Sequence, residues 1–128
     1  MVLPRHIYDR IIEHARTDYP DIACGVVVGA NGRARRHVPM ENAARSPTFY
    51  EMNPKQLVAL YREMDDLDEE LLVIYHSTPL PEAQLSRIDI AYANEPGAHY
   101  AVVSPEGPLL RAYRVVDGVA TETGVQVI

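Results

Sequence analysis

The spacing of apolar residues predicts two amphipathic helices in the first half of the chain. The first covers residues 4–18 and begins with a proline, which suits a first helical turn. Its apolar face is formed by Ile7, Ile11, Ile12 and Ala15. The second begins at Asn53, a helix-capping residue type followed by Pro54 at the first helical position. Its apolar face is formed by Leu57, Leu60, Tyr61 and Met64.

Short runs of β-branched and aromatic residues predict strands around these helices. Residues 24–40 predict two strands joined by a hairpin turn at Asn31-Gly32, and residues 48–52 predict a short strand. The continuous apolar run 71–76 predicts a buried central strand. The tail of the chain predicts two or three further strands with Gly-Pro and Asp-Gly turns. Mixed helices and strands, without a repeat or linker, indicate one α/β domain.

Bulk composition narrows the class of protein. The length of 128 residues falls within the range of a single domain, and 47% of the residues are hydrophobic. The net charge is −6, with eleven arginines and one lysine, so we do not expect a nucleic-acid-binding protein.

The sequence also carries no sign of a membrane protein. Its longest apolar stretches, such as 71–75, are far shorter than a membrane span, and the charged first twenty residues do not resemble a signal peptide. The single cysteine, Cys24, agrees with a reducing environment, so we expect a cytoplasmic protein.

Candidate chemistry is concentrated in the stretch HSTPLPEAQLSRID, residues 76–89. His76 ends the predicted central strand, and Ser86 and Asp89 stand at the start of a third predicted helix in a capping-box arrangement. Strand ends and helix starts often bind ligands in α/β proteins. On spacing alone, however, each of the three residues has an ordinary structural explanation.

The same stretch resembles the signature of the JAMM (also called MPN) metallopeptidases. That signature reads His-x-His, seven residues, Ser, two residues, Asp, and His76, Ser86 and Asp89 fit it while Thr78 departs. The phrases RSPTFY, VIYHS, LSRID and YRVVDG are similar to bacterial members that process ubiquitin-like sulfur-carrier proteins. The resemblance implies one JAMM/MPN-like domain over residues 1–128. Its implied fold is α/β (α+β), with a central, mixed but mostly antiparallel sheet flanked by helices.

The resemblance also implies a zinc site. In the family, two histidines and an aspartate hold Zn²⁺ with a water at the open position, a glutamate acts as general base and the serine stabilises the oxyanion. Carried over by position, His76 and Asp89 are metal ligands and Ser86 is the oxyanion helper. The second histidine falls on Thr78, and the glutamate falls on Ile22 of PDIACG.

These two departures decide the expected chemistry. A threonine hydroxyl is a poor substitute for imidazole in a zinc site, and isoleucine cannot accept a proton. We therefore expect doubtful zinc occupancy and no ordinary JAMM proteolysis. A carboxylate from Glu82 or Asp21 could still complete an altered site, so the sequence leaves open whether the chain is an enzyme.

Three functions follow from this reading. The first is a non-catalytic module that binds the tail of a ubiquitin-like sulfur-carrier protein or an active JAMM paralogue. The second is an altered-site, metal-dependent hydrolase that releases an amino acid from a sulfur carrier. The third is a structural or small-molecule role, with the domain forming a homodimer.

A few other residues are candidates for a functional or a structural role. Thr48 and Tyr50 lie where family members shape the cleft and are candidates for contacts with the carrier tail. We expect Cys24 to be a buried core residue and His99 to be a structural histidine. His6, His14 and His37 sit on a predicted helix and strand edge, and we expect nothing nearby to recruit them.

Overall fold

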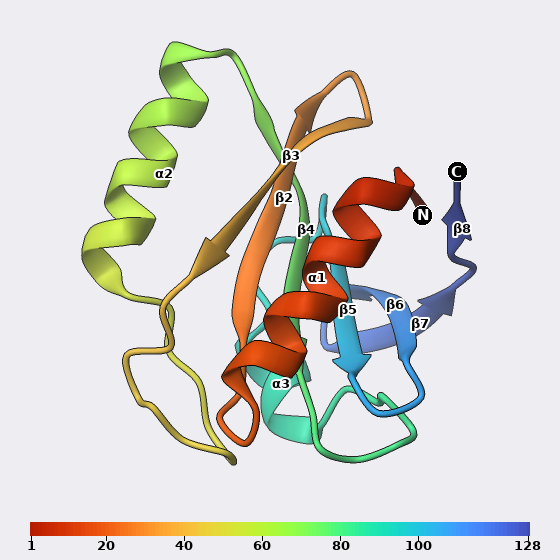
Figure 1. The fold of residues 1–128 in the computed structure, drawn as a ribbon. Coiled ribbons are helices and arrows are strands. Elements are labelled where there is room, and N and C mark those ends of the chain that lie inside the picture. Colours follow the sequence, from red (N-terminus) through yellow and green to blue (C-terminus); the bar gives the residue numbers. More distant parts are fainter.

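A six-stranded sheet organises the computed structural model, which describes residues 1–128 (Figure 1). Its order is β3-β2-β4-β5-β6-β7, and only the β4–β5 pair is parallel. The six strands are β2 (Cys24–Ala30), β3 (Arg33–Met40), β4 (Glu70–Ser77), β5 (His99–Ser104), β6 (Leu109–Val116) and β7 (Val119–Thr123). The short strands β1 (Val2–Leu3) and β8 (Gln126–Val127) form a separate parallel pair. The helices are α1 (Arg5–Asp18), α2 (Pro54–Asp66) and α3 (Arg87–Tyr92).

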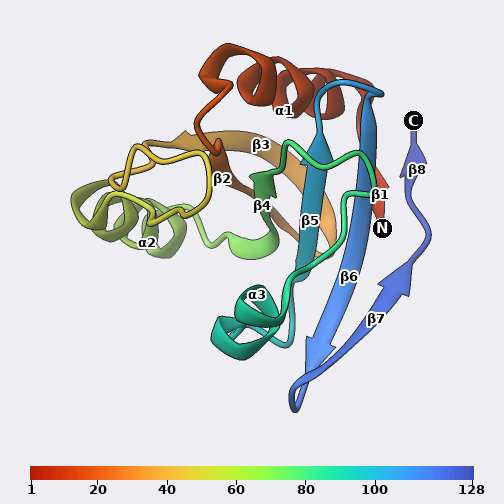
Figure 2. The same ribbon diagram turned by 90° about the horizontal axis from the view of Figure 1, so that it is seen from below.

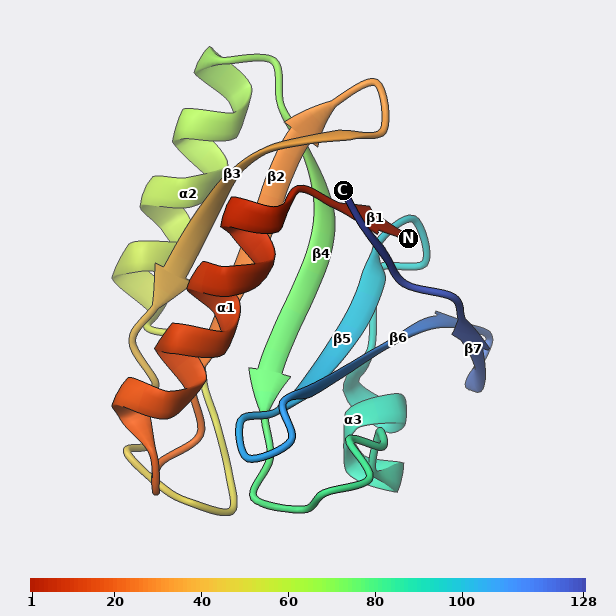
Figure 3. The ribbon, with the colours of Figure 1, turned by 45° about the vertical axis from the view of Figure 1, so that its right-hand side comes forward.

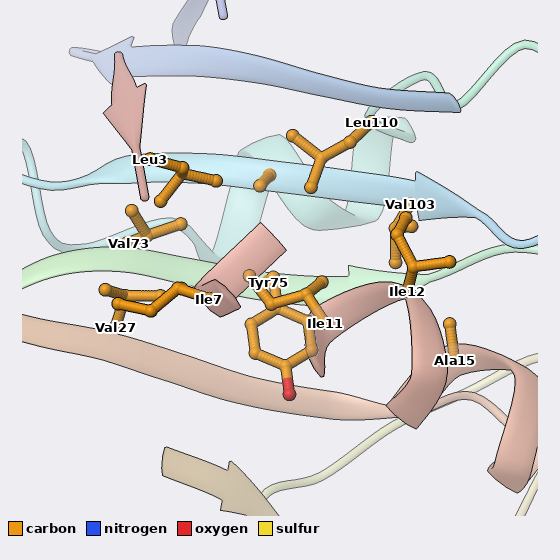
Figure 4. Close-up of a cluster of buried hydrophobic side chains, with 11 residues drawn as sticks. Leu3, Ile7, Ile11, Ile12, Ala15, Val27, Val73, Tyr75, Val103 and Leu110 are labelled. Carbon is orange, nitrogen blue, oxygen red and sulfur yellow. The ribbon is translucent and has the colours of Figure 1, made fainter. Parts of the chain in front are cut away.

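The helices divide between the two faces of the sheet. Figure 2 shows α1 on one face and both α2 and α3 on the other. Side chains alternate between faces along a strand, so each strand contributes to two cores. The core under α1 contains Leu3, Ile7, Ile11, Ile12, Ala15, Val27, Val73, Tyr75, Ala101, Val103 and Leu110 (Figure 4). The core under α2 contains Cys24, Val26, Val28, Met40, Leu60 and Met64.

Most of the predicted elements are confirmed. The hairpin turn between β2 and β3 uses Asn31 and Gly32 with positive φ angles of 53° and 74°. The Asn53 side chain caps α2 by accepting hydrogen bonds from the backbone N–H groups of Lys55 (2.9 Å) and Gln56 (3.2 Å). The predicted central strand is β4, which lies between β2 and β5. None of the three helices has the length and apolar composition needed to cross a membrane.

The strand predicted at residues 48–52 is wrong. This segment is a loop with a single bridge, between Asn42 and Met52. The physical reason is the Asn42 side chain, which occupies backbone groups that strand pairing would need. It accepts from the N–H of Glu51 (3.1 Å) and donates to the carbonyl of Phe49 (3.1 Å).

Candidate functional site

His76 and Asp89 meet at the C-terminal end of β4. Nε2 of His76 lies 3.4 Å from Oδ2 of Asp89, and both side chains are largely buried. His76 comes from the central strand β4 and Asp89 from the first turn of α3, whose capping box holds the carboxylate. The structure therefore brings together the two metal-ligand positions that the sequence predicted.

Ser86 orients the aspartate through the predicted capping box. Its Oγ accepts from the Asp89 N–H (3.1 Å), and its own N–H donates to Asp89 Oδ2 (2.8 Å). Burial alone would raise the pKa of the Asp89 carboxyl, but the hydrogen bonds from His76 and Ser86 outweigh it and lower that pKa. The carboxylate is thus held ionised beside His76, while the exposed Ser86 hydroxyl keeps its own hydrogen free to donate.

Tyr50 covers the imidazole of His76. The two rings are stacked, with centroids 4.7 Å apart and planes 19° apart. Burial raises the pKa of the Tyr50 hydroxyl, and the nearby Asp89 carboxylate adds to the effect. Tyr50 is therefore a neutral phenol that forms one wall of the site.

Neither replaced position contributes a metal donor. The Thr78 Oγ1 accepts from the N–H of Leu80 (3.1 Å), a local turn within its own loop. Ile22 is buried, and its backbone is held by Ser46 O (2.9 Å) and by Asn42 Nδ2 (3.0 Å). The position expected for the general base thus holds an aliphatic side chain in a fixed backbone.

The remaining donors do not fit zinc. No group of three or more His, Cys, Asp or Glu side chains is arranged to hold a metal ion. Glu82 is exposed, and Asp21 lines a cleft with His14, Asp18 and Ile22 that includes neither His76 nor Asp89, so neither carboxylate completes the site. A catalytic zinc normally needs three protein ligands, and this chain offers His76 and Asp89. Doubtful zinc occupancy stays a prediction, and the two-ligand donor set supports it.

The other candidates have structural surroundings. Cys24 is fully buried beside His76 in the β2–β4 register, as predicted, and burial raises the pKa of its thiol to about 12. A thiol held so firmly protonated is a poor nucleophile. His99 pairs with Val73, three residues along β4 from His76, and so stands away from the site. Thr48 is exposed near the loop end, with its N–H bonded to Ser46 Oγ.

Sequence reasoning missed the residue that shapes the loop between β3 and α2. Asn42 is buried, and its amide bonds to four backbone groups: the N–H groups of Ala44 and Glu51 and the carbonyls of Ile22 and Phe49. An asparagine two residues after a strand is a turn signal, which was available in the sequence. Asn42 thereby joins the loop that carries Tyr50 to the segment that carries Ile22.

Together, the mixed sheet, the helices on both faces and the His76–Ser86–Asp89 constellation define a metallopeptidase-like α/β domain. The chain belongs to the family of prokaryotic homologues of the JAB domain, whose model matches residues 4–116. It is 46% identical over 133 residues to the CysO-cysteine peptidase of Mycobacterium tuberculosis, a match that covers 100% of this chain and 91% of that protein.

Solved structures agree with this fold. A protein from Desulfitobacterium hafniense has a TM-score of 0.85 at 23% identity, covering 100% of this chain and 93% of its own. A structure described as a metalloprotease-like zinc site in the proteasome and signalosome has a TM-score of 0.66 at 16% identity, covering 100% and 97%. At these identities the likeness supports the fold, which is the JAMM/MPN-like fold expected from the sequence.

Proposed function

We propose that this chain is a non-catalytic member of its family that binds the C-terminal tail of a ubiquitin-like sulfur-carrier protein. The similarity to the CysO-cysteine peptidase over the whole chain supports the class of partner. The donor set at the end of β4 supports the loss of hydrolysis.

One observation carries the proposal. His76 and Asp89 pair directly with one another, while Thr78 and Ile22 occupy the remaining ligand and base positions. With two ligands, zinc would have to rely on water for the rest of its coordination. Without a carboxylate at Ile22, no side chain at that position can take the proton of an attacking water, a loss that typically reduces rates by about 10²–10⁴-fold.

The wall of the site still suits a peptide tail. Tyr50 presents an aromatic ring beside His76, and the exposed Ser86 hydroxyl can donate to a carbonyl or carboxylate. Thr48 lies on the exposed side of the same loop. An extended tail next to these residues would gain its affinity from main-chain hydrogen bonds and its specificity from the side chains along it.

The test measures zinc and tail binding on the same protein. Equilibrium dialysis against micromolar zinc should leave less than one equivalent bound. Calorimetry with a ubiquitin-like carrier ending in Gly-Gly should show binding, and the same carrier without these two glycines is the matched control. Stoichiometric zinc together with cleavage of a carrier conjugate would overturn the proposal, as would equal binding of the two carriers.

A second function, an altered-site hydrolase, is favoured by the free Ser86 hydroxyl and the intact His76–Asp89 pair. Its test is release of an amino acid from a carrier–amino acid conjugate, with several divalent metals and with chelator. If no amino acid is released under any of these conditions, the altered-site hydrolase is excluded. An active paralogue as partner and a homodimer remain predictions from the sequence, and sedimentation of the chain with and without such a paralogue would test both.

A further inference from the structure

The hydroxyl of Tyr75 lies between two histidines on the α1 face of the sheet. Nδ1 of His14 in α1 and Nε2 of His37 in β3 are each 2.6 Å from this oxygen. The expectation that these histidines have nothing nearby to recruit them is therefore wrong. They lie on different elements, and no local pattern in the sequence indicates that α1 and β3 both contact Tyr75 of β4.

The fold makes room for this hydroxyl inside the core. Tyr75 is fully buried, and Figure 4 shows its oxygen pointing away from the surrounding aliphatic side chains. Gly25 of the neighbouring β2 faces the ring, and a Cβ at this position would lie 2.5 Å from the Tyr75 oxygen. A side chain on residue 25 would thus displace the hydroxyl from its two partners.

Asp18 fixes the direction of the hydrogen bonds. Its Oδ2 lies 3.2 Å from Nε2 of His14, so the neutral imidazole must carry its hydrogen on Nε2. Nδ1 of His14 is then an acceptor and receives the single hydrogen of Tyr75. The Tyr75 oxygen in turn accepts from Nε2–H of His37. The position of the Asp18 carboxylate therefore determines where each hydrogen lies in the hydrogen-bonded chain Asp18–His14–Tyr75–His37.

We propose that these four residues form a proton relay that takes up one proton at His37 and places its charge on His14 against Asp18. A proton from solvent binds Nδ1 of His37, and the hydrogen on His37 Nε2 passes to the Tyr75 oxygen. The original Tyr75 hydrogen passes to Nδ1 of His14. The product has a neutral His37, a neutral tyrosine that now donates to His37, and an imidazolium at His14 paired with Asp18.

The relay keeps all its hydrogen bonds in both states. Before uptake the tyrosine donates to His14, and after uptake it donates to His37, so one proton reverses the chain without breaking it. A second proton would leave the Tyr75 hydrogen without an acceptor. The relay therefore takes up a single proton. The proton enters at His37 of β3, and the resulting charge appears on His14 of α1.

The surrounding groups hold the resting state uncharged. Burial lowers the pKa of His14, although Asp18 opposes this, and burial, His14 and Arg10 lower the pKa of His37 to about 4. Burial raises the pKa of Tyr75, with Cys24 of β2 and Asp18 adding to the effect. Further charges face His14 and Asp18 across their cleft, namely Asp21, Glu41 and Arg45.

Proton uptake would change a cleft at the surface. His14 and Asp18 line a cavity of about 460 Å³ together with Ile22 and Asn42, the residues that join the site loop to β2. Charging His14 makes the His14–Asp18 contact a true ion pair in this wall. The relay thus connects the pH of the medium to the cleft that Ile22 and Asn42 also line.

Nitrogen-detected NMR of the histidine side chains tests the relay in the intact chain. At pH 7.5 we expect both rings to be neutral with their hydrogens on Nε2. On acidification, His14 should become an imidazolium while His37 stays neutral and moves its hydrogen to Nδ1, both with the same midpoint. Separate midpoints, or a His37 that never changes tautomer, would overturn the proposal.

Substitution of the carboxylate tests the coupling without disturbing the core. Asp18→Asn still accepts from His14 but removes the negative charge, so the His14 midpoint should fall by about one pH unit. The tautomer change of His37 should fall by the same amount, although Asp18 does not touch His37. Asp21→Asn, which removes a charge from the same cleft without a bond to His14, should move both midpoints less. A shift at His14 alone in Asp18→Asn would contradict the relay.

Discussion

The phenol ring of Tyr50 lies almost flat on the imidazole of His76, with 4.7 Å between the ring centroids. The His76 imidazole, a predicted metal ligand, is thus covered on one face and paired with Asp89 at its Nε2. A side chain from the loop between β3 and α2 consequently forms a wall of the site, and a bound tail would meet it directly.

Replacing Tyr50 should weaken tail binding through the loss of this aromatic wall. Truncating an aromatic side chain that carries binding energy costs about 1–2 kcal/mol, so Tyr50→Ala should lower the affinity for a Gly-Gly carrier by roughly five- to thirtyfold. Tyr50→Phe keeps the ring and serves as the control, with nearly unchanged affinity. Calorimetry measures both, and equal affinities for the two variants would exclude Tyr50 from the tail contact.

Thr78→His should restore a third zinc ligand. Structural zinc sites bind with about 10–16 kcal/mol over four ligands, so one added imidazole should tighten zinc binding by roughly 100- to 1,000-fold. Thr78→Val, which offers no donor, is the matched control and should bind zinc as weakly as the natural sequence. Dialysis with metal analysis makes the comparison.

Catalysis should require a second replacement. Ile22→Glu supplies the missing base, so the double variant with Thr78→His should turn over a carrier conjugate about 10²–10⁴-fold faster than Thr78→His alone. Turnover by the natural sequence at the level of the double variant would mean that the two departures do not disable the site.

Folding stability should fall as the pH drops from about 6.5 toward 4. The folded-state pKa of His37 lies near 4, below the value of about 6.5 in an unfolded chain, so the unfolded state binds more protons in this interval. The stability from His37 is complete above pH 6.5. Because the ring is partly exposed, solvent screening limits the loss to about 1–2 kcal/mol. Urea unfolding at pH 7.5 and 4.5 should show a smaller difference for His37→Gln, and an equal difference would argue against this origin.

Gly25→Ala should destabilise the protein by about 1–3 kcal/mol, because the new methyl group would press on the buried Tyr75 hydroxyl. Gly97→Ala is a suitable control, since a Cβ at that position meets nothing within 4 Å. Thermal or urea unfolding compares the two. Similar stabilities would show that the ring of Tyr75 moves aside at little cost.

The sequence predicted those elements whose signals are local. The Asn53 cap, the Asn31-Gly32 turn and the Ser86–Asp89 capping box depend on residues within a few positions of each other, and all three are confirmed. His76 and Asp89 were paired through a recognised motif rather than through physical reasoning, because their contact spans a loop whose path the sequence does not reveal.

The errors concern long-range contacts. The segment around Tyr50 has the β-forming residues of a strand, but the buried Asn42 takes its backbone groups, so tertiary hydrogen bonding overrides local propensity. The His14–Tyr75–His37 contact joins residues 61 and 38 positions apart. The periodicity of apolar residues along one helix or strand cannot predict a contact between residues so far apart in the chain.

The pairing of β1 with β8 places both ends of the chain beside each other, and Figure 3 shows them away from α3. A backbone hydrogen bond also joins the two terminal segments, in which the Arg5 N–H donates to the Ile128 carbonyl at 2.8 Å. A fluorophore or surface anchor attached at either end would therefore sit on the same side of the molecule and leave the His76 region accessible. Immobilised protein should accordingly remain open to a carrier arriving from solution.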